Sequence, residues 1–181
     1  MGMKTEKIYI EYLVLQVQTG ESSALQKLLP LIQQRMLSYA KRLMQGSADA
    51  EDCVQDALMV VVKKLGQVKE PKAFHGWMYQ VINSRCQDHW RRNQLASQQM
   101  DETNQESETF ESVHVEVSEQ ALDIKQAMLR LSKIQQSVIY LFYFEGFKVS
   151  ELAVILGKPA GTIKSLLFDA RAAIKSFLNQ E

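Results

Sequence analysis

The sequence of 181 residues is poor in the residues that interrupt helices, with 8 glycines and 3 prolines. This scarcity disfavours an all-β chain and favours long unbroken helices. Its two cysteines, Cys53 and Cys86, are far apart, which argues against a disulfide scaffold and for a reduced cytosolic protein. No apolar run approaches the length that spans a bilayer, and the first residues lack the apolar core of a signal peptide. We therefore expect a cytoplasmic protein without membrane insertion.

Net charge is also absent, because 21 basic residues balance 21 acidic ones. The balance conceals a segregation along the chain. Residues 63–92 carry a net charge of +5, residues 101–123 carry eight acidic and no basic side chains, and residues 124–181 return to a net +4. Two basic segments around an acidic one are typical of two modules that face nucleic acid and are joined by a solvated tether.

The spacing of apolar residues defines the expected fold class. Helices are predicted over residues 8–17, 22–44, 48–65, 73–92, 122–131, 133–144, 149–156 and 160–178. Pro30 lies inside the second of these and predicts a kink there. Residues between 93 and 119 are rich in Gln, Ser and Glu and predict a mostly disordered segment. The chain is therefore predicted to be all-α, with two small helical domains, 1–93 and 120–181, joined by a flexible acidic linker over 94–119.

Residues 146–171 form the most informative segment, because they read as helix, tight turn and helix. Gly157 suits the left-handed conformation that ends a helix, and Ile163 and Leu167 are spaced to pack the second helix onto the first. Polar residues near the start of the second helix are left for a partner. This is the layout of a helix-turn-helix, whose second helix enters the DNA major groove. A helical hairpin that never touches DNA is the alternative.

Four blocks, in this order, resemble a bacterial sigma factor of the sigma-70 type, in the small extracytoplasmic-function (ECF) group. Residues 48–57, ADAEDCVQDA, look like the acidic run of the family's region 2. Residues 74–92, FHGWMYQVINSRCQDHWRR, look like its promoter-melting helix. Residues 131–146, LSKIQQSVIYLFYFEG, and the helix-turn-helix look like region 4. The resemblance covers about residues 22–93 and 120–178.

The resemblance implies a function in transcription initiation. Such a protein binds core RNA polymerase through the β′ coiled coil and the β flap, directs it to promoter DNA and opens the duplex. It is not itself an enzyme, so we expect no catalytic residues, no metal and no cofactor. An anti-sigma factor that covers the polymerase-binding faces is a further partner that the family implies.

The resemblance also distributes the candidate site residues over three surfaces. The expected polymerase-binding residues are Asp49, Glu51, Asp52, Gln55 and Asp56. Those expected at the −10 element are Lys69, Lys72, Asn83, Ser84, Arg85, Asp88, His89, Trp90, Arg91 and Arg92. Those expected at the −35 element are Ala160, Thr162, Lys164, Ser165, Phe168 and Arg171. Opening a promoter requires cations for phosphates and aromatic faces or amides for bases, and the −10 set offers both.

Several positions depart from the family pattern. Asn83 and Ser84 stand where the family commonly has Arg-Asn, which leaves open which bases are recognised. In the recognition helix, Leu166, Phe168 and Asp169 stand where basic residues are usual. We therefore expect contact with the −35 element to be weaker or differently specified.

Other interpretations compete with the sigma factor. A conventional repressor or activator would use the helix-turn-helix alone and would usually dimerise. A degenerate sigma-like chain would bind polymerase or a regulator without working on promoters. Cys86 and His89 are spaced to share a ligand face, but nothing else in the sequence completes a zinc site.

Overall fold

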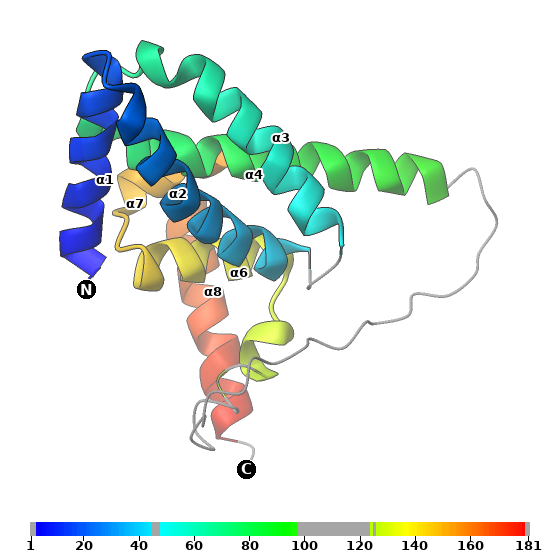
Figure 1. The fold of residues 1–181 in the computed structure, drawn as a ribbon. Helices are drawn as coiled ribbons and strands as arrows, with labels where there is room; N and C mark the ends of the chain where they lie inside the picture. Colours follow the sequence, from blue (N-terminus) through cyan, green and yellow to red (C-terminus); the bar gives the residue numbers. More distant parts are fainter. Residues whose placement is uncertain (1–2, 45–47, 98–123, 125, 180–181) are drawn as a thin grey trace, which may run out of the picture. The chain divides into compact units, whose positions relative to one another are not determined.

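The computed structural model describes residues 3–44, 48–97, 124 and 126–179 (Figure 1). Every regular element among these residues is helical, which confirms the all-α prediction. The chain divides into two compact units, Met1–Glu108 and Thr109–Glu181. The predicted flexible linker lies outside the described residues except for residues 94–97. Among the described helices, none has both the length and the apolar character needed to cross a bilayer.

The first unit is a bundle of four long helices, drawn from blue to green in Figure 1. They are α1 (Met3–Gln18), α2 (Ser22–Leu43), α3 (Asp49–Lys64) and α4 (Pro71–Ser97), with a short 3-10 turn, η1 (Leu65–Gln67), after α3. Helix α2 packs against the other three, and α4 also packs against α1 and α3. The centre of the bundle is apolar and fully buried, with side chains that include Ile10, Leu28, Ile32, Met36, Phe74, Met78 and Ile82.

The ends of α4 differ from the prediction in both directions. The helix begins at Pro71, two residues earlier than expected, because the fixed φ of proline suits the first helical position and its missing N–H costs no bond there. It continues to Ser97, so residues 94–97 are helical where the linker was expected to begin. Helix α2 also runs uninterrupted through Pro30.

The second unit is built around the predicted helix-turn-helix. Residues 126–129 are helical, and they are followed by α6 (Lys133–Ile139), a π-helical segment η2 (Tyr140–Phe144), α7 (Val149–Leu156) and α8 (Ala160–Leu178). Helix α8 packs against α6 and α7, and its buried residues Ile163, Leu167 and Ala170 form the contact face. The expected single helix over 133–144 changes to π-helical geometry at Tyr140, which the apolar pattern did not distinguish from an α-helix.

Local signals at the helix ends explain why these elements begin and end where they do. Ser132 and Gln135 form a reciprocal capping box at the start of α6. Gly157 ends α7 with φ +62°, the left-handed conformation predicted for it. Lys148 and Pro159 precede α7 and α8 without a side-chain cap, but the Glu151 carboxylate accepts a hydrogen bond from the Lys148 N–H at 2.7 Å.

The turn supplies a matched pair of glycine substitutions. Gly157→Ala should destabilise the second unit by about 1 kcal/mol, because an L side chain is strained at this positive φ although no atom would touch the new Cβ. Gly161→Ala, within α8 and equally open, should instead stabilise by about 0.5 kcal/mol. Hydrogen exchange of the α7 and α8 amides in the full chain measures both. Equal effects of the two substitutions would contradict the role of the left-handed turn.

Candidate nucleic-acid and polymerase interfaces

The expected polymerase-binding residues lie at the beginning of α3. Glu51, Asp52, Gln55 and Asp56 are exposed, whereas the opposite side of the helix buries Ala50, Cys53, Val54 and Ala57 in the bundle. The acidic residues of the first turn also lie at the positive end of the helix dipole, so their position stabilises α3. Glu51 lies 4.0 Å from the Lys41 ammonium of α2, so it can meet a partner only while sharing or giving up that weak pair. No hydrogen bond or ion pair joins Asp52, Gln55 or Asp56 to another described residue, so these three are available to a partner as they stand.

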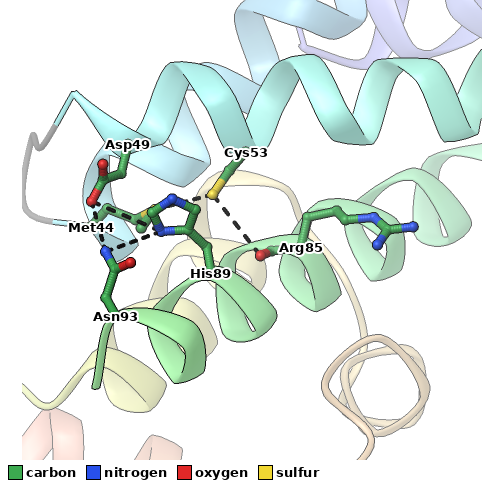
Figure 2. A network of polar contacts seen from close by, with 6 residues as sticks. All are labelled: Met44, Asp49, Cys53, Arg85, His89 and Asn93. Atoms are coloured by element: carbon green, nitrogen blue, oxygen red, sulfur yellow. Dashed lines mark hydrogen bonds and ion pairs between the residues drawn. The ribbon is translucent and has the colours of Figure 1, made fainter. Parts of the chain in front are cut away.

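Asp49 is engaged with α4 inside the unit (Figure 2). Its Oδ2 accepts a hydrogen bond from Asn93 Nδ2 of α4 at 3.1 Å and lies 3.9 Å from His89 Nδ1. Asn93 Nδ2 and His89 Nδ1 are 3.4 Å apart, which closes the group. Asp49 thus joins the start of the acidic helix to the far half of α4, which carries the expected −10 residues.

Helix α4 exposes a basic surface on its far half. Arg91 and Arg92 are exposed, and Trp90 has 47% of its surface accessible, as a base-stacking residue requires. Arg85, Asp88 and His89 are half-buried. The Asp88 carboxylate lies 4.0 Å from Arg85 and 3.9 Å from Arg91, so a single acid pairs with an arginine on either side of it along the helix. Lys69 and Lys72, before and within the first turn of α4, and Ser84 are exposed as well.

Asn83, one of the expected −10 residues, is buried. Its side chain is only 5% exposed, and its Oδ1 accepts a hydrogen bond from the Tyr39 hydroxyl at 3.1 Å. The Tyr39 ring in turn makes an edge contact with Tyr79, with centroids 5.4 Å apart. Because a buried amide must find a partner inside the protein, Asn83 belongs to the core of the bundle. In this conformation it cannot present its amide to a base edge.

Gln18 is a residue that the sequence analysis missed. Its Nε2 donates to the carbonyl oxygens of Leu65 and Val68, at 3.2 and 2.7 Å. These two carbonyls bracket η1, so the last turn of α1 holds the segment that leads to Lys69 and Lys72. A polar residue at a helix end carries no sequence signal for such a contact, since its partners lie 47 and 50 positions away.

The cysteines occupy the interface between α3 and α4. Cys53 and Cys86 are both buried, Cys53 Sγ lies 3.5 Å from Met44 Sδ, and burial raises the pKa of both thiols. Among the described residues, no group of three or more His, Cys, Asp or Glu side chains is arranged to hold a metal ion. The pair is best explained as part of the core.

These raised pKa values give a testable consequence. At pH 8 both thiols should stay protonated, so the native chain should react with iodoacetamide at least about tenfold more slowly than the urea-unfolded chain. At pH 9 the native chain should still react much more slowly in absolute rate, because its thiolate fraction stays well below that of the unfolded chain. Mass spectrometry of the alkylated peptides measures each cysteine separately. Rapid native labelling of either residue would show that the thiol is not held in the core.

Helix α8 presents the expected −35 residues on its exposed side. Ala160, Thr162, Lys164, Ser165 and Phe168 are exposed, and Phe168 reaches 71%. Arg171 is anchored within the unit, because its Nε donates to the Tyr143 hydroxyl at 2.7 Å and its guanidinium lies over the Phe142 ring. A hollow of about 510 Å³ adjoins this face and is lined by Phe142, Val149, Lys164, Ser165, Leu167, Phe168, Asp169 and Arg171.

Comparison with known proteins identifies both units. Sigma-70 region 2 matches residues 31–96, and Sigma-70, region 4 matches residues 121–174. The RNA polymerase sigma-H factor of Pseudomonas aeruginosa is 26% identical over 179 residues, which cover 93% of each chain. The ECF RNA polymerase sigma-E factor of Escherichia coli K12 is 26% identical over 181 residues, which cover 94% of each chain.

Two solved structures agree with these matches. The sigma factor RpoE from Bartonella quintana, in complex with the anti-sigma factor NepR, aligns with a TM-score of 0.71 and 26% identity over 86% of this chain and 96% of its own. CnrH, in complex with the cytosolic domain of CnrY, has a TM-score of 0.65 over 96% and 99% of the two chains; its identity of 17% indicates a common fold alone. The chain belongs to the sigma-70 family of transcription initiation factors. Within that family it is a member of the ECF group.

Proposed function

We propose that this chain acts as a sigma factor that binds core RNA polymerase, directs it to specific promoters and helps to melt the −10 region. The observation that carries the proposal is the presence of both modules in family order, each with an exposed polar face. Polymerase and promoter DNA are the partners of this activity, and it places the protein in the cytoplasm. The chemistry belongs to the polymerase, so the chain needs no catalytic group.

Each module has a distinct task in this proposal. The four exposed polar residues at the start of α3 dock on the polymerase β′ coiled coil. The basic far half of α4 holds the separated strands, with Trp90 as the stacking surface and Arg91 and Arg92 on phosphates. Helix α8 enters the major groove at the −35 element. Asp49 and Asn83 act inside the first unit and support the position of α4.

An anti-sigma factor is a further proposed partner. The RpoE structure from Bartonella quintana contains the anti-sigma factor NepR. The second unit exposes large apolar side chains that include Tyr143, Phe144 and Val154, and such exposed side chains suit a protein partner.

In vitro transcription tests the proposed function directly. The full chain is mixed with core RNA polymerase and a genomic fragment library, and transcript starts are sequenced. Discrete new starts that share upstream sequence are expected. Asp52→Arg/Asp56→Arg should weaken binding to core enzyme by at least about tenfold, because like charge across an interface is costly. Glu11→Arg, a charge reversal on α1 rather than α3, is the control.

The alternatives give different results in the same experiment. A conventional repressor or activator would bind DNA without co-eluting with core enzyme. A sigma-like interaction protein would co-elute without producing starts. Either result would refute the proposed function.

Lys164 tests the phosphate contacts of α8 separately. Its side chain is exposed on the face proposed to meet DNA. Lys164→Ala should lower the affinity for all DNA sequences and make the slope of log K against log salt shallower by about one phosphate contact. Fluorescence anisotropy of labelled duplexes across a salt series measures this slope. If the slope does not change, Lys164 makes no phosphate contact.

A further inference from the structure

Asp169 is an exposed carboxylate on the recognition helix. It borders the hollow beside α8 together with Lys164, Ser165 and Phe168. Within the described part of the chain it makes no hydrogen bond or ion pair. The nearest cation in sequence, Arg171, donates to Tyr143 instead. The charge of Asp169 is therefore not neutralised inside the unit.

A free carboxylate restricts what α8 can meet in a major groove. Near a phosphate it is repelled, and the acceptor-rich edge of guanine, with N7 and O6, repels it as well. Adenine offers the N6 amino group, but its N7 acceptor lies beside that donor. Cytosine offers the N4 amino group without a neighbouring acceptor on the same base, and Asp and Glu are the side chains that accept from it.

We infer that Asp169 is a specificity-determining residue that selects a cytosine in the −35 element. The inference rests on the proposed function, since it requires α8 to enter the groove of promoter DNA. From the sequence alone, the acid was expected to weaken DNA contact. The exposed and unneutralised carboxylate changes that interpretation, because it excludes most base edges and retains one. Asp169 thus lowers the general affinity of α8 for DNA and at the same time narrows the base preference at one base pair.

The test uses the full chain with core RNA polymerase on a promoter library randomised across both the −35 and −10 elements. Transcripts made with the natural chain should be enriched in cytosine at one −35 position by about fivefold over the other bases, the lower end of the range for a specific side chain–base pair. Asp169→Ala should abolish that enrichment. Asp169→Asn should move the preference toward adenine, because an amide pairs with N6 and N7 together. Enrichment at every −10 position should stay unchanged.

Glu11→Ala is the matched control, because it removes one acid from a helix that contributes no proposed DNA contact. It should leave all base preferences as they are. Neither Asp169→Ala nor Asp169→Asn should affect folding, because Asp169 is exposed and Asn has nearly the same shape as Asp. Selection that is insensitive to Asp169, with −10 enrichment intact, would overturn the inference and leave the proposed function standing. Absence of any start with the natural chain would overturn both.

Discussion

The first unit depends on the buried contact between Tyr39 of α2 and Asn83 of α4. The hydroxyl donates to the amide oxygen at 3.1 Å, and the Tyr39 ring packs edge-on against Tyr79. A single buried hydrogen bond contributes only about 1 kcal/mol to stability. Removing one partner costs more, because the other polar group is then buried without a hydrogen bond. The contact therefore reinforces the rotation of α4 that its buried apolar face, with Phe74, Met78 and Ile82, already sets. With Asn83 facing inward, Ser84 and Arg91 face outward, and the basic surface follows from that choice.

The polar contacts on the surface of this unit support the same arrangement. Asp49 holds the far half of α4 through Asn93 and His89 (Figure 2). Asp88 lies between Arg85 and Arg91 on the same helix. Each contact is partly exposed, so each contributes a modest free energy, of the order of 0.2–1 kcal/mol. The Asp88 contacts also offset the repulsion between Arg85 and Arg91 on the same helix. The acidic helix and the basic helix are thus organised by the same few carboxylates.

Much of this architecture was predictable because its signals are local. The limits of α7 and α8 and the left-handed Gly157 agree with the prediction, since apolar spacing and one glycine determine them. The acidic first turn of α3 and the exposure of Trp90 were predictable for the same reason. The burial of Asn83 was not predictable, because its partner Tyr39 lies 44 positions earlier in the chain and no local pattern indicates that contact. The π-helical geometry of η2 was not predicted, because the same apolar residues fit an α-helix equally well.

Gln18 supports the loop before α4 through two hydrogen bonds, although it is not among the residues expected to contact DNA. Helix α1 lies before residue 31, where the match to the family's region 2 begins, yet its last turn clamps both carbonyls around η1. The loop that carries Lys69 is therefore only as rigid as the junction between α1 and the rest of the bundle. Two relatives with identical DNA-facing side chains could differ in how fast they open a promoter, because their first helices make different hydrogen bonds to this loop. Natural variation in strand opening would then arise at a position that no comparison of DNA-contacting residues would examine.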